Sequence, residues 1–420
     1  KFKMVALTEA VDVTRFIISD AIVSTTYGAT SANGVATSTI YNFKLYDGTT
    51  LIAGPKSLTA SSTPTNGGCI DFNLGGATPY RVNVGTEKVI TLKGTISAWP
   101  SIASGSTHTF SLQTNPVGDA AATRAVTARG VGSGTALNGP TTVGTGNAIT
   151  VRRAYPVVER LALASNTLAG GSTSHKQVAN FKVTAVGGQV RLKKMTFQVS
   201  WTDTTTSTNL SLSNFKLYRN GSLMGTTEYV IFDGTGTAAG DELSPSGTAT
   251  LTSDGFSNTN GRSPNSTSTF ATVLFGLQRT DIDASGASGD TGSGEEVIAS
   301  GSSNTYELKI DVANAHTGAS TDSDSITVTL LGDDTQTQPL TSNIAEHTGP
   351  YDYRNGVIAL NSVKTYRFIW SDYSANTNDH SSSFLAVGGG TGSDWAYGYQ
   401  VPSGTNQASY IPLDAWTISK

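Results

Sequence analysis

Residues 181–218 read FKVTAVGGQVRLKKMTFQVSWTDTTTSTNLSLSNFKLY, and this stretch decides the fold. Apolar and polar residues alternate along most of it, which predicts three β-strands separated by polar turns. A looser copy occupies residues 2–46, where FKMVAL, VDVTRFIIS and NFKLY follow one another in the same order. Because an internal repeat determines the architecture of the whole chain, we expect two copies of one β unit.

The two copies match at fixed offsets. Phe2 corresponds to Phe181 at an offset of 179 residues (181 − 2). Val11 corresponds to Val190 at the same offset, whereas NFKLY recurs letter for letter at an offset of 172. The seven-residue difference (179 − 172) falls in a Ser/Thr-rich connection, where a loop can absorb a change in length.

Each NFKLY is followed by a turn signal. Asp47-Gly48 follows the first directly, and Asn220-Gly221 follows the second one residue further on. These dipeptides between apolar runs predict hairpins, because a type I′ turn places two residues at positive φ. The returning strands would be residues 50–52 and 222–224.

Both units also end alike. KVITLKGTI at 88–96 matches NTYELKIDV at 304–312 at an offset of 216, and HTFSL at 108–112 matches DSITV at 324–328 at the same offset. Turn residues interrupt the chain every 8 to 12 residues, a spacing typical of antiparallel sandwiches. We therefore predict an all-β protein of tandem antiparallel β-sandwich domains, Ig-like or jelly-roll-like, with a smaller β-rich C-terminal region.

Four segments follow from this division. Residues 1–146 would form the first sandwich unit with a Gly/Thr-rich trailing segment. Residues 147–332 would form the second, with an insertion at 229–303. Residues 333–350 read as a polar linker, and residues 351–420 as an aromatic-rich C-terminal β region.

The second unit opens with VVERLAL at 157–163, for which the first unit has no equivalent. The missing strand could lie upstream in a longer chain, since the sequence opens at Lys1 without Met. Alternatively, another subunit supplies it by β-strand addition. In that case Phe2, Met4 and Val11 would line the assembly groove.

The chain ends in a strand-like run, AWTIS at 415–419, and the predicted donor is residues 415–420 or the region 413–416. Trp416 and Ile418 would be the side chains that enter the groove of a neighbouring copy. Head-to-tail contacts of this kind do not close on themselves and so generate filaments.

The composition excludes several classes. Charged residues make up 14% of the chain and the net charge is −4, so nothing indicates nucleic-acid binding. Cys69 is the single cysteine and excludes an internal disulfide. No apolar stretch approaches the length of a membrane span.

One loop has the opening of a calcium site. Asp281, Asp283 and Ser285 alternate and are followed by Gly286, as in an EF-hand-like loop. The twelfth position is Gly292 in place of the bidentate acid. Calcium binding at these residues therefore stands beside the alternative of a flexible acidic loop.

Catalysis finds no support in the sequence. The five histidines are scattered without metal-ligand spacing, and no G-x-S-x-G elbow is present. Asp379-His380-Ser381 has the residue types of a hydrolase, but three adjacent residues cannot form a spatial triad by themselves. We predict that the protein is not an enzyme.

The aromatic residues of the tail allow a second kind of function. Trp395, Tyr397 and Tyr399 could form a surface that stacks on a cell-surface glycan. The alternative is that the tail aromatics pack in a core.

F-K-V-T-A, L-K-K-M-T-F, S-N-F-K-L-Y and L-K-I-D-V together resemble the tandem β-sandwich repeats in predicted cell-surface proteins of candidate-phyla-radiation bacteria. The run RFIWSDYS at 367–374 resembles the end of those proteins. The resemblance implies an extracellular S-layer or appendage component that is non-catalytic and self-associating. We therefore expect a subunit that assembles with copies of itself into a surface layer or filament, with an adhesin or carbohydrate-binding module as the alternative.

Overall fold

The computed structural model describes most of the chain, in these ranges: 1–23, 40–60, 67–76, 79–96, 107–112, 125–139, 145–203, 210–233, 242–244, 251–252, 255–256, 268–275, 296–316, 324–333, 367–374, 395–404 and 409–419. The chain divides into two compact units, Lys1–Arg153 and Ala154–Lys420. Every regular element in the described ranges is a β-strand, as the alternating pattern predicts. Among these residues, no helix is long and apolar enough to cross a membrane.

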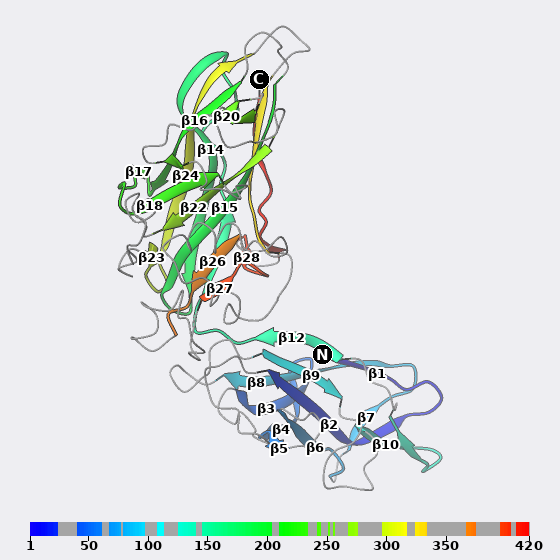
Figure 1. The fold of residues 1–420 in the computed structure, drawn as a ribbon. Coiled ribbons are helices and arrows are strands. Elements are labelled where there is room, and N and C mark those ends of the chain that lie inside the picture. The colour runs from blue at the N-terminus through cyan, green and yellow to red at the C-terminus, as the bar shows by residue number, and fades with distance from the viewer. Residues whose placement is uncertain are drawn as a thin grey trace. The chain divides into compact units, whose positions relative to one another are not determined.

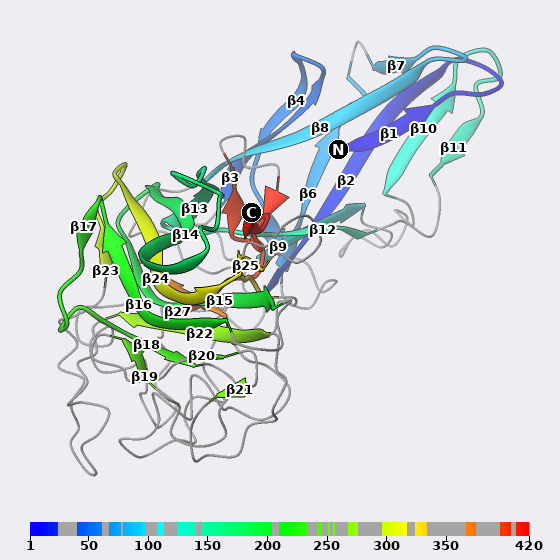
Figure 2. The same cartoon turned by 90° about the horizontal axis from the view of Figure 1, so that it is seen from above.

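Two sheets form the first unit. One has the order β1-β8-β3-β4, and the other has β11-β10-β2-β6-β5 with β7, β9 and β12 attached (Figure 2). The strands are β1 (Phe2–Val5), β2 (Val11–Val23), β3 (Ile40–Asp47), β4 (Thr50–Lys56), β5 (Thr59–Ala60), β6 (Gly67–Asn73), β7 (Tyr80–Val82), β8 (Glu87–Ile96), β9 (Thr107–Leu112), β10 (Val126–Gly130), β11 (Ala136–Asn138) and β12 (Thr145–Thr150).

The second unit repeats this plan with longer sheets (Figure 1). One sheet has the order β21-β20-β16-β24-β14-β13-β28-β29, and the other has β19-β18-β22-β15-β25-β30. Its strands are β13 (Tyr155–Arg160), β14 (Gly171–Val186), β15 (Val190–Thr202), β16 (Ser211–Arg219), β17 (Ser222–Leu223), β18 (Tyr229–Asp233), β19 (Glu242–Ser244), β20 (Leu251–Thr252), β21 (Gly255–Phe256), β22 (Ser268–Phe275), β23 (Glu296–Ile298), β24 (Ser303–Ala315), β25 (Ser325–Leu330), β26 (Phe368–Ser371), β27 (Trp395–Tyr397), β28 (Pro402–Ser403), β29 (Ser409–Tyr410) and β30 (Trp416–Ser419).

Strand register confirms the repeat residue by residue. Phe2 of β1 lies opposite Ile90 of β8. Phe181 of β14 lies opposite Tyr306 of β24, which are the partners expected from the offsets of 179 and 216. The pairings of β3 with β8 and of β16 with β24 agree in the same way with the offset of 172. The two units are therefore copies of one sandwich.

The repeated NFKLY contains a matched β-bulge. Asn42 and Asn214, its first residues, have φ values of 52° and 51°. The register against β8 and β24 shifts at the same point in both copies. Asn tolerates this left-handed conformation better than most residues with a Cβ, which explains its place at a bulge.

The hydrophobic core of each unit lies between its two sheets. On β14, alternate residues face inward, and Phe181, Val183 and Ala185 are all fully buried. Their side chains meet the inward residues of β15, for example Phe197, whose ring centroid is 5.8 Å from that of Phe181. This alternation lets the edge strands of the two units be compared position by position.

Three predicted boundaries differ from the structure. The first unit extends to Arg153 and not to residue 146, because β12 pairs with β9 of that unit. The predicted insertion, 229–303, contains β18 and β22, which are regular strands of the sheet formed around β15. The tail predicted as a separate region, 351–420, supplies β26, β28 and β30, which pair with strands β15, β13 and β25 of the second unit. Both segments complete sheets of the second unit, because their strands cover edges that would otherwise be open.

Candidate assembly edge

β1 is an edge strand of the first unit. It pairs with β8 on one side only, and no described residue pairs with Phe2–Val5 on the other side. An edge of this kind presents unpaired backbone N–H and C=O groups to an incoming strand.

The second unit fills the equivalent position. There β14 pairs with β24 on one side and with β13 on the other. Val158 of β13 lies opposite Val183. At the offset of 179, Val183 corresponds to Met4 of β1. The same edge of the same fold is thus covered in one copy and uncovered, among the described residues, in the other.

Burial records this difference. Phe181 and Val183 are fully buried, whereas their counterparts Phe2 and Met4 are only half-buried. The Phe2 ring packs edge-on against Phe16 with a centroid distance of 5.4 Å. Val11 is also half-buried and packs against the same core. The structure therefore brings the three predicted groove residues, Phe2, Met4 and Val11, to one partly exposed core.

The ion pairs of the two edge strands also differ between the units. In the second unit the ammonium of Lys182 lies 2.5 Å from a carboxylate oxygen of Glu159, which belongs to the covering strand β13. In the first unit the counterpart Lys3 pairs instead with Glu87 at 2.6 Å, and both side chains are more than half exposed. Ser303 occupies the position of Glu87 in the second unit, at the offset of 216.

Apolar side chains also lie on the outer face beside this edge. Val5 is 45% exposed. Val89 of β8, which lies opposite Lys3 and diagonal to Val5, is 41% exposed. Thr184 and Thr305 stand at these two positions in the second unit. The first unit therefore exposes two apolar side chains on this face where the second unit has threonine.

The predicted donor strand does not lie free. Trp416 and Ile418 of β30 are 0% and 1% exposed, and β30 pairs with β25 of its own unit. The Trp416 indole N–H donates to the carbonyl of Leu161 at 2.8 Å. The Arg160 guanidinium carbon lies 5.4 Å from the centroid of the Trp416 ring. The prediction that these residues enter a neighbour is therefore wrong for the folded chain, because they already fill a core position.

Two other predicted sites are only partly visible. Asp281, Asp283 and Ser285 lie outside the described residues, and within the described residues no cluster of His, Cys, Asp and Glu could hold a metal. Trp395 and Tyr397 belong to β27, which pairs with β26, but their side chains lie outside what the structure describes. Nearby Tyr399 is half-buried.

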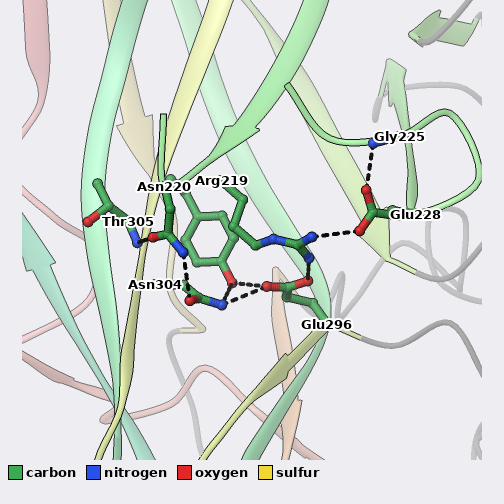
Figure 3. A network of polar contacts seen from close by, with 8 residues as sticks. Arg219, Asn220, Gly225, Glu228, Glu296, Asn304 and Thr305 are labelled. Atoms are coloured by element: carbon green, nitrogen blue, oxygen red, sulfur yellow. Dashed lines mark hydrogen bonds and ion pairs between the residues drawn. The ribbon is translucent and has the colours of Figure 1, made fainter. Parts of the chain in front are cut away.

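A polar network that the sequence did not reveal ties four segments of the second unit together (Figure 3). The buried Glu296 carboxylate accepts hydrogen bonds from Arg219 at 2.6 Å, from the Tyr306 hydroxyl at 2.6 Å and from Asn304 at 2.9 Å. Arg219 also donates to Glu228 at 2.7 Å. Burial, aided by the adjacent Glu296 carboxylate, raises the pKa of Tyr306 well above its usual value. Three protein donors thus stabilise the buried Glu296 carboxylate.

The first unit also contains a pair that residue spacing could not show. His108 Nδ1 lies 2.7 Å from an Asp20 carboxylate oxygen, and both side chains are 1% exposed. The two residues are 88 positions apart in the chain and meet because β9 pairs with β2.

No family model matches the chain, and no curated protein matches it. One similar solved structure is the major pilin subunit BcpA of Bacillus cereus, with 9% identity over 76% of this chain and 64% of that chain at a TM-score of 0.18. Another is the full-length major pilin SpaD from Corynebacterium diphtheriae, with 8% identity over 74% and 62% at a TM-score of 0.19. The chain thus spans less than two thirds of either pilin. TM-scores this low establish no common fold, and we base the function on the chain's own geometry.

Proposed function

We propose that the chain is a non-catalytic structural subunit of an extracellular filament or surface layer, and that copies join by strand addition at β1. One observation carries this proposal: β13 covers the edge of the second unit, while no described residue covers the same edge of the first. Half-buried Phe2 and Met4 would become buried when a strand from another copy pairs there, and the area removed from water would favour assembly.

Sedimentation and negative-stain microscopy of the purified 420-residue chain test this function. We expect ordered polymers from the wild type. Met4→Asp places a charge in the groove and should leave dispersed chains. Leu51→Asp is the matched control, because Leu51 is exposed on β4 of the same sheet but distant from β1 in the sheet order.

The outcomes separate the alternatives. Dispersed wild-type chains under all conditions would contradict the structural role and favour the binding module. Circular dichroism verifies that each variant is folded. A parallel series with calcium and with a chelator tests the predicted site at Asp281, Asp283 and Ser285, since calcium-dependent polymers would assign it a role in assembly.

A further inference from the structure

The second unit shows which kind of strand fits the edge of the first. We propose that β1 binds an extended segment of another polypeptide that runs antiparallel to it. This segment carries small or aliphatic side chains facing Met4 and Ala6, and a carboxylate facing Lys3. The inference rests on the proposed function and names the chemistry of the partner.

The inward positions define the apolar part of the pattern. Val158 and Pro156 of β13 lie opposite Val183 and Ala185, and all four side chains are buried. At the offset of 179, these β14 residues correspond to Met4 and Ala6 on β1. An incoming strand must therefore present an aliphatic residue to Met4 and, two residues earlier in its own sequence, a small or compact residue to Ala6.

The backbone at Ala6 makes the same hydrogen bond as the backbone at its counterpart, Ala185. Gly85 N–H donates to the Ala6 carbonyl at 2.8 Å, and Gly301 N–H donates to the Ala185 carbonyl at 3.1 Å. These two bonds are equivalent at the offsets of 179 and 216. The end of β1 is thus fixed in the conformation that receives β13 in the second unit, and binding needs little rearrangement there.

The residue of the incoming strand that faces Lys3 is defined by charge. Glu159 follows Val158 directly and lies opposite Lys182, whose counterpart is Lys3. The Lys3 side chain is 62% exposed, so it can reach a second carboxylate while it remains next to Glu87. An acidic residue directly after the aliphatic one therefore favours the antiparallel register and disfavours a strand shifted by one residue.

A synthetic peptide of residues 154–161, AYPVVERL, is the probe. Fluorescence anisotropy should show that it binds the full chain and blocks polymer growth. The Val158→Asp peptide should bind at least about tenfold more weakly, because its charge would enter an apolar groove. The Met4→Asp chain should lose the peptide and the Leu51→Asp chain should keep it, which excludes exchange with the chain's own β13.

A charge swap tests the register without disturbing the core. Lys3→Glu should weaken binding of AYPVVERL by about threefold, the size expected for an exposed ion pair, and the Glu159→Lys peptide should restore it. Equal binding of all peptides, or binding unaffected by Met4→Asp, would overturn the inference.

The two proposals can fail separately. Polymers that form without binding or responding to the peptide would overturn this inference and leave the assembly role intact. Specific peptide binding to chains that never polymerise would support the inference and contradict the assembly role.

Discussion

At the scale of single residues, two charged groups, Lys194 and Asp333, lie where β26 pairs with β15. Lys194 of β15 is fully buried. The Asp333 carboxylate accepts backbone N–H groups from Arg367 at 2.7 Å and Gly398 at 2.6 Å, which flank β26 and β27. Burial lowers the pKa of Lys194 to about 7, and burial raises the pKa of Asp333.

This gives the second unit a pH-dependent stability. Between pH 7 and the ordinary lysine pKa of about 10.4, the unfolded chain binds a proton that folded Lys194 has released. The free energy of unfolding should therefore rise with pH in this window, by at most about 1.4 kcal/mol per pH unit. Urea titrations followed by tryptophan fluorescence measure it. Lys194→Met should flatten the rise, and an unchanged slope would contradict the assignment.

The Glu296 network predicts an asymmetry between two carboxylates. Glu296→Gln should destabilise the second unit by about 3 kcal/mol, because Arg219 loses a buried charged partner. Glu228→Gln should cost about 1 kcal/mol or less, since Glu228 is 39% exposed. Urea unfolding of the two variants measures both values. Equal losses would show that the network does not depend on the buried carboxylate.

At the scale of elements, the β-bulge explains why both copies of NFKLY begin with asparagine. Asn42 has a φ of 52°, so Asn42→Val should destabilise the first unit by about 1 to 2 kcal/mol. Asn42→Gly should stay within about 0.5 kcal/mol of the wild type, because glycine adopts positive φ freely. Urea unfolding followed by circular dichroism measures the stability of both variants. An Asn42→Val variant as stable as the wild type would show that backbone conformation does not require asparagine at this position.

The C-terminal strand β30 is a core element of the second unit. Trp416→Ala should cost about 3 to 5 kcal/mol, because the fully buried indole leaves a cavity. Thr417→Ala, on the exposed face of the same strand, should change stability by about 0.5 kcal/mol or less. Thermal unfolding compares the two variants. Loss of polymers from Trp416→Ala with no loss of stability would restore the donor assignment that the structure contradicts.

Local pattern predicted most strands and both hairpins, but it misplaced one turn and could not give the long-range pairing. Asp47 pairs with Thr50, so the turn of the first hairpin is Gly48-Thr49 and not Asp47-Gly48.

The offset of 216 assigned to β9 and β25 is wrong by two: Ile18 lies opposite Leu112, whereas its counterpart Phe197 lies opposite Leu330, which gives 218. A shift of two keeps the same side chains facing inward, so alternation cannot detect it. The sequence did not predict β22 as a strand of the sheet, because its partner β15 lies far from it in the chain.

The open edge at β1 was predictable from a comparison of the two repeats. Comparing the copies showed that β1 lacks the strand before it, and the structure agrees for the described residues. The Glu296 network was not predictable, because Arg219 is 77 residues from Glu296 in the chain and the pairing of β16 with β24 brings Arg219 next to Tyr306. Trp416 was misassigned because an apolar, strand-like end has the same pattern in a core as in a donor.

At the scale of the whole molecule, the chain contains two copies of one fold, and among the described residues only the second has a strand beyond the position of β1. The second unit is lengthened by β13 and by the strands of the tail, whereas β1 of the first unit ends its sheet among the described residues. Under the proposed function, a strand of another copy would fill this open edge. The resulting head-to-tail contact would not close on itself.

Hydrogen–deuterium exchange on dispersed and assembled chains tests the central claim most directly. In dispersed chains, the amides of residues 2–7 should exchange faster than those of residues 181–186, which β13 covers. In assembled chains, residues 2–7 should become protected while residues 181–186 stay unchanged. Equal exchange of residues 2–7 before and after assembly would contradict strand addition at β1.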